Sequence, residues 1–171
     1  MTYALDEIDK HIDYLEFEDA VRFHYAAVAL RKLRTEYRLA LDHENSLVDM
    51  LPDSAKALET RSECWELMDK DTRNLRGHFD RIGIERESWR ISDGKEKAIQ
   101  DLTSAIELDD TVGRRIKRAR VEAELFGFEE AWEDMMIAET MAKTDKDRES
   151  LRLSTWALRV REKEARRVAA L

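Results

Sequence analysis

The chain has 171 residues, of which 43% are hydrophobic and 40% charged, with five glycines, one proline and a net charge of −8. An average domain carries about 25% charged residues, and so little glycine and proline excludes collagen-like, low-complexity and turn-rich β structures. The excess of acid also argues against a chain that coats nucleic acid along its whole length, because phosphate binding needs clustered lysine and arginine. Long, heavily charged helices are expected instead.

Three bulk features indicate a cytoplasmic protein. No apolar run approaches the roughly 18–20 residues that a membrane-spanning helix needs. The first residues lack the basic start and apolar core of a secretory signal. Cys64 is the single cysteine, so an internal disulfide is excluded and a reducing compartment is expected.

In the first half of the chain, apolar spacing predicts a short helix over about 4–15 and a second helix over about 18–42. A short piece at 46–51 ends at Pro52, which cannot continue a helix interior. The pair at 53–54, Asp-Ser, then offers an N-cap to a third major helix.

Two rows of positions seven residues apart run through this third helix, and six of the eight positions are apolar. The rows are Leu58, Trp65, Thr72 and Phe79, and Arg61, Met68, Leu75 and Ile82. Such a seam is typical of one helix packed in a bundle. The alternative is a structural homo-oligomer joined through the 58–82 seam, so a homodimer stays open.

In the second half, helices are predicted at about 95–108, 111–126, 128–142 and 147–169, with the aspartates at 109–110 as the cap of the second of these. Strand-like alternation is absent from the sequence.

A repeat of small residues connects three of these helices. Ala98 and Ala131 are 33 residues apart, and each is followed seven residues later by another alanine, Ala105 or Ala138. Small residues at this spacing let a neighbouring helix approach closely. The pattern resembles the second helix of a tetratricopeptide unit, whose period is 34 residues, and the segment around Ala20 resembles it too.

The predicted fold is therefore all-α, with about seven or eight helices. We expect antiparallel helical hairpins stacked as a short tetratricopeptide-like solenoid, or an irregular helical bundle. Residues 1–76 are predicted to form an N-terminal hairpin or bundle region. Residues 77–171 are predicted to form a tetratricopeptide-like region with a C-terminal capping helix, and one continuous domain is the alternative.

Catalytic, metal and cofactor sites are not predicted. The Glu-x-x-His pattern of di-iron bundles is absent, and the five glycines do not cluster into a phosphate-binding loop. His24 lies on an apolar helix face and is expected in the core, and Cys64 is expected to act as a small hydrophobe. A non-enzymatic protein is therefore expected.

The sharpest local feature is a basic cluster with five positive charges in seven residues. Its members are Arg114, Arg115, Lys117, Arg118 and Arg120. One interpretation is a solvated face that pairs with the acidic first two-thirds of the chain. The others are a surface for an anionic partner and a DNA-linked regulator that uses the basic helix 111–121.

The tetratricopeptide resemblance implies a concave groove lined by the first helix of each unit. The lining positions carried over to this chain are Asp80, Glu87, Arg90, Arg120 and Glu124. Together with Arg114 and Arg118, these residues are the predicted partner-binding site. The resemblance thus implies a protein-interaction module, an adaptor, scaffold or regulatory binding protein, whose partner is another protein or peptide, with neither membrane nor cofactor.

The four tryptophans at 65, 89, 132 and 156 leave one question open in the sequence. They can fill the core, which is the ordinary use of tryptophan, or one of them can be exposed as a docking hot spot.

Overall fold

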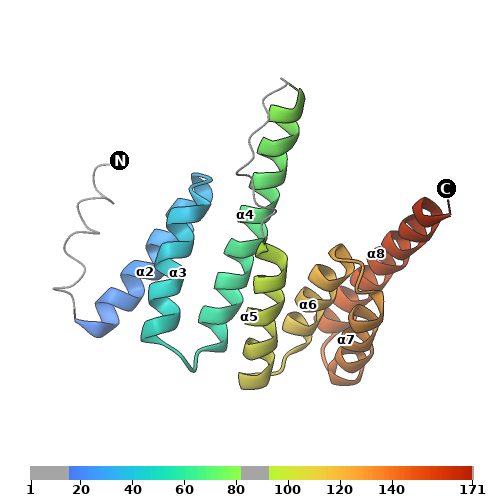
Figure 1. Cartoon of the computed structure of the whole chain (residues 1–171). Helices are drawn as coiled ribbons and strands as arrows, with labels where there is room; N and C mark the ends of the chain where they lie inside the picture. Colours follow the sequence, from blue (N-terminus) through green and yellow to red (C-terminus); the bar gives the residue numbers. More distant parts are fainter. Residues whose placement is uncertain (1–15, 82–92, 171) are drawn as a thin grey trace. The chain divides into compact units, whose positions relative to one another are not determined.

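The computed structural model describes residues 16–81 and 93–170, and the side chains of these residues except those of 72–81. The chain divides into two compact units, Met1–Ser92 and Asp93–Leu171 (Figure 1). The boundary expected at 76/77 falls inside a helix and stays a prediction. The helix expected at 4–15 lies outside the described residues.

Three antiparallel helices form the described part of the first unit, α2 (Phe17–Leu33), α3 (Tyr37–Met50) and α4 (Ala55–Arg81). Helix α3 packs against both α2 and α4. Small and aliphatic side chains fill the core between them, so the helices approach closely. The buried set is Val28, Ala40, Leu41, Leu47, Ala57 and Cys64.

The helix predicted over 18–42 is wrong, because the chain breaks between α2 and α3 at Thr35. Thr35 has a φ of 59°, and the backbone N–H of Glu36 donates to the carbonyl of Arg31 at 2.9 Å. This is a Schellman ending, which usually places glycine at the left-handed position. The guanidinium of buried Arg31 donates to the Glu36 carboxylate at 2.8 Å across the same turn. The piece predicted at 46–51 is accordingly the last part of α3.

The start of α4 confirms the predicted cap. The backbone N–H of Ala57 donates to the side chain of Ser54 at 3.2 Å. Leu58 is buried, and Trp65 and Met68 pack against the core of their own unit, as one packed helix requires. The remaining seam positions, from residue 72 on, lie outside the described side chains, and the homo-oligomer stays a prediction.

Four helices form the second unit: α5 (Gly94–Leu108), α6 (Val112–Glu124), α7 (Phe128–Met141) and α8 (Asp145–Ala169). Helix α6 packs against α5, α7 and α8, and α7 also packs against α8. All four were predicted, with ends that differ from the structure by at most two residues. Their core includes Ala119, Ala123, Met135, Leu151 and Leu158.

The cap predicted for α6 at Asp109 and Asp110 is wrong. Thr111 is the N-cap, and its side chain accepts from the backbone N–H of Arg114 at 3.3 Å. The two aspartate side chains instead accept from arginines of α6, so this acidic pair serves ion pairing rather than capping.

The repeated alanines are buried as the small-residue pattern predicts. Each of the six is at most 6% exposed, namely Ala20, Ala27, Ala98, Ala105, Ala131 and Ala138. The described residues form helices and contain no strand. The predicted all-α fold of antiparallel helical hairpins is therefore confirmed.

Thr144 begins α8 with a capping box, in which its side chain accepts from the backbone N–H of Asp147 at 3.1 Å and Asp147 accepts in return. We expect Thr144→Ala to lower the free energy of unfolding by about 1 kcal/mol, because the cap is lost. Thermal unfolding followed by circular dichroism measures this. The control Thr140→Ala, at an exposed position of α7, should change the free energy of unfolding by no more than about 0.5 kcal/mol. Equal losses in the two variants would show that the cap does not stabilise α8.

Candidate functional site

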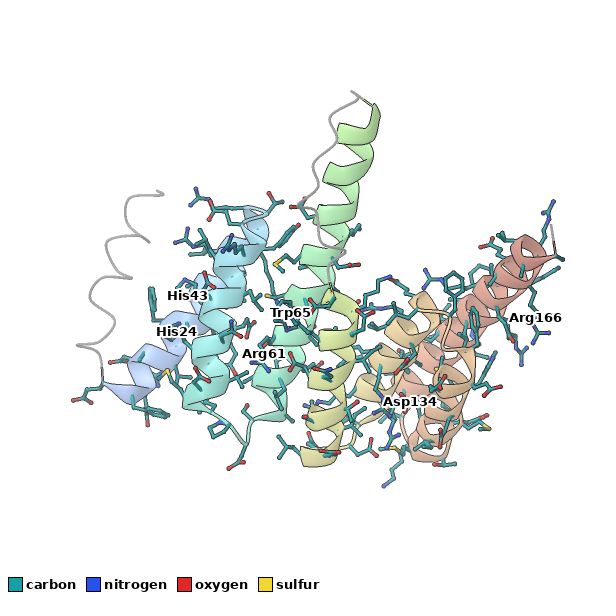
Figure 2. The ribbon with its side chains drawn as sticks, in the orientation of Figure 1. His24, His43, Arg61, Trp65, Asp134 and Arg166 are labelled. Atoms are coloured by element: carbon teal, nitrogen blue, oxygen red, sulfur yellow. The ribbon has the colours of Figure 1, made fainter. Side chains whose placement is uncertain are left out.

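The centre of the second unit holds a buried carboxylate between two arginines. Asp134 of α7 (Figure 2) is 2% exposed and accepts from Arg118 of α6 at 2.7 and 2.8 Å. Arg115 donates to the same carboxylate at 2.8 Å. Arg118 also donates to the Thr103 hydroxyl of α5 at 3.0 Å. One polar cluster thus joins α5, α6 and α7.

The remaining bonds of these arginines also stay within the unit. Buried Arg114 donates to the backbone carbonyl of Asp109 at 2.6 Å and to its carboxylate. Arg115 donates twice to the Asp110 carboxylate, at 2.9 and 2.7 Å. The hydrogen bond from Arg115 holds the pKa of the Asp110 carboxyl below its usual range. The guanidinium groups of residues 114, 115 and 118 therefore meet carboxylates of their own unit. Asp109 and Asp110 belong to the acidic first two-thirds of the chain, as the self-pairing interpretation expects, but Asp134 does not, and Arg114 is buried rather than solvated.

A groove of about 440 Å³ lies between α6 and α8. Its walls are mostly small or aliphatic and include one aromatic side chain, and they comprise Ile116, Ala119, Ala123, Trp156, Ala157 and Val160. Charged side chains of both signs join this lining, namely Lys117, Arg120, Glu124, Arg161 and Glu164. Apolar walls with a few charged groups are typical of a binding site.

Two of the predicted partner-binding residues, Arg120 and Glu124, line this groove. Arg120 is exposed, whereas Glu124 is partly buried and pairs with Lys95 at 2.5 Å and with Arg161 at 3.3 Å. Burial raises the pKa of the Glu124 carboxyl, but the bonds and charges of Lys95 and Arg161 outweigh burial and lower that pKa overall. Glu124 thus stays ionised, and its two ion pairs connect α6 to α5 and to α8.

Two further predicted residues, Arg114 and Arg118, do not line the groove. Arg114 and Arg118 bond to aspartates within the unit, as described above. Glu87 and Arg90 lie outside the described residues, and the side chain of Asp80 lies outside the described side chains. Their role in partner binding stays a prediction.

The tryptophans answer the question that the sequence left open. Trp65 and Trp132 are partly buried, and the Trp132 indole donates to the Glu162 carboxylate at 3.1 Å. Trp156 is 67% exposed and lines the α6/α8 groove. Among the described tryptophans it is the exposed one.

The remaining candidates for chemistry are packed in the first unit. His24 is buried as expected, and its Nδ1 lies 3.1 Å from Nδ1 of His43, which sequence reasoning missed (Figure 2). Cys64 is also buried, and burial raises the pKa of its thiol to about 12, which suits a small hydrophobe rather than a nucleophile. Within residues 16–81 and 93–170, no group of three potential metal ligands gathers.

Asp134 was also missed from the sequence, although a signal for it exists. It lies three residues after Ala131 and four before Ala138, which places a carboxylate on the apolar face of its helix. A charge at such a position requires a buried partner. The basic cluster one helix earlier supplies two.

None of the helices described is both long enough and apolar enough to cross a bilayer. No family model and no curated protein matches the chain. Among solved structures, a monomeric mutant of IFIT1 with m7Gppp-AAAA matches with a TM-score of 0.62 and 17% identity. The match covers 75% of this chain and 29% of the IFIT1 chain, so this chain corresponds to less than a third of that protein.

At this identity the likeness shows the fold. IFIT1 is an all-helical protein of the tetratricopeptide type. The chain therefore has an all-α helical-repeat fold that resembles the tetratricopeptide type.

Proposed function

We propose that this chain is a non-enzymatic interaction module that binds a segment of a partner protein in the α6/α8 groove. The observation that carries the proposal is Trp156, an exposed aromatic side chain beside small apolar walls and near charges of both signs. Exposed aromatic anchors of this kind dominate binding energy in protein interfaces. With Cys64 as its single cysteine, we expect the module to work in the cytoplasm.

The charges of the groove indicate the kind of segment that fits. Arg120 is exposed near one wall, and Glu164 lies near the other. Because the lining carries charges of both signs, a segment with its own charge pattern is oriented as well as bound.

A nucleic-acid partner is the second candidate, because the IFIT1 structure contains the capped oligonucleotide m7Gppp-AAAA. The basic helix 111–121 is the segment that would bind it. However, three of its five cations already meet carboxylates, so few remain for phosphates. A gel-shift assay at about 50 mM salt tests this candidate, and a shift that weakens steeply with added salt would favour it.

Arg120→Glu tests the groove. We expect this change to weaken partner capture by roughly five- to thirty-fold, about 1–2 kcal/mol, because it reverses a charge in the lining. The measurement is quantitative mass spectrometry of an affinity pull-down from the native host. The melting temperature should stay unchanged because Arg120 is exposed.

Arg38→Glu is the matched control, because Arg38 is an exposed arginine of α3 in the other unit. It should leave capture by the module intact. If Arg120→Glu lowers both the melting temperature and the capture of the partner, Arg120 stabilises the fold and is not shown to bind the partner. If capture is unaffected, the groove is not the binding site.

A further inference from the structure

Helix α8 has one buried row and one exposed row of apolar side chains. Leu151 and Leu158 are buried in the core of the second unit. Leu153, Trp156 and Val160 are 53%, 67% and 37% exposed. The spacing i, i+3, i+7 places the exposed three on one face of the helix, turned away from the core.

This face continues onto the neighbouring helix. Met136 of α7 is also exposed, and it lines an open hollow of about 830 Å³ together with Leu153 and Trp156. Exposed apolar residues that occur singly are ordinary, but contiguous ones mark an interaction surface. The surface adjoins the α6/α8 groove, because Trp156 and Val160 line the groove as well, whereas Leu153, Met136 and Arg159 do not.

The second half of the same face carries positive charge. Arg159, Lys163 and Arg167 are exposed and form no ion pair with any residue of the described ranges. By contrast, Arg152 pairs with Glu149 at 2.7 Å, and Arg166 (Figure 2) with Glu162 at 2.5 Å. Helix α8 has eight basic and five acidic residues, a net charge of +3 within a chain of −8. Along α8 the exposed face is therefore apolar from Leu153 to Val160 and basic from Arg159 to Arg167.

We propose that this outward face of α8 binds an acidic amphipathic helix of another protein. Apolar side chains of that helix pack against Leu153, Trp156 and Val160. Its carboxylates pair with Arg159, Lys163 and Arg167, which would otherwise keep their charges in water. A helix laid against an apolar face, with i, i+3, i+4 and i+7 anchors, is a common recognition mode.

Charge decides between this occupant and two others. In a second copy of this chain, parallel α8 helices would set Lys163 and Arg167 against each other. A nucleic acid needs phosphate contacts along its length and aromatic stacking. Leu153 and Val160 supply neither of these. An acidic helix satisfies both halves of the face.

The test is a selection from a displayed library of amphipathic helical peptides of about 18 residues, five turns long. Leucines are fixed at helical spacing, and each flanking position is randomised between glutamate and lysine. Glutamate should be enriched in peptides that bind the full chain. A library without binders, or without glutamate enrichment, would overturn the proposal.

Variants then locate the bound peptide. Trp156→Ala should weaken a selected peptide about tenfold or more, as loss of an aromatic anchor does. The double reversal Lys163→Glu with Arg167→Glu should invert the preference, so that lysine is enriched. All three positions are exposed, so melting temperatures should not change. A preference that does not invert contradicts the proposal.

Arg120→Glu is the control that separates this face from the groove, and it should leave the selected peptides bound within about twofold. If the peptides depend on Arg120 and not on residues 163 and 167, they occupy the groove, and the proposed function stands while this inference falls. Displacement of the peptide by a single-stranded RNA, or a dimer abolished by Trp156→Ala in sedimentation, would also overturn it.

Discussion

Replacing Asp134 with alanine is expected to lower the free energy of unfolding by about 3–5 kcal/mol, because two arginines then lose their buried counter-charge. Asp134 accepts three hydrogen bonds from Arg115 and Arg118, all between 2.7 and 2.8 Å. Urea unfolding followed by circular dichroism measures the loss. Asp134→Asn keeps an acceptor without the charge and should show a smaller loss.

Glu133→Ala is the matched control, since Glu133 is the exposed neighbour of Asp134 on the same helix. Its effect should stay within about 0.5 kcal/mol. If Asp134→Ala were equally mild, the basic cluster would not depend on a buried counter-charge. The cations would then be available to an outside anion, and the nucleic-acid alternative would gain.

Leu102→Ala is expected to cost about 2–5 kcal/mol, because truncation leaves a cavity at a position with no solvent exposure. Leu102 is the large residue between Ala98 and Ala105 in α5, where the repeat pattern calls for a side chain that fills the groove of a neighbouring helix. The urea unfolding midpoint of the purified protein reports the loss.

Leu108→Ala makes the same truncation at the exposed end of α5, where the side chain is 45% accessible. It should cost less than about 1 kcal/mol, since little buried area is lost. Equal costs at both positions would mean that α5 does not pack through the face that carries the repeated alanines.

The sequence predicted most of the fold because its signals are local. Periodic apolar positions gave all four helices of the second unit, and Ser54 marked the start of α4. The helix break at Thr35 was not predicted, because the residue in the left-handed conformation there is a threonine rather than a glycine. Phe126 holds the same conformation at 65°, but Gly127 beside it marked that boundary.

The candidate site was predicted in part. Arg120 and Glu124 line the α6/α8 groove, and their role in partner binding stays a prediction. The pairing of Asp134 with Arg115 and Arg118, and that of His43 with His24, were not predicted. Such buried polar pairs depend on tertiary structure, because they join residues on different helices. Trp156 could not be told from Trp132 by sequence, since packing alone decides which one is exposed.

Hydrogen–deuterium exchange of the chain with and without its captured partner tests the central claim most directly. We expect new protection in 116–124 and 154–164, the segments that face the α6/α8 groove, and little change in 17–50 of the first unit. Protection confined to 17–50, or absent from both segments of the second unit while the partner is bound, would contradict a protein-binding role for this groove.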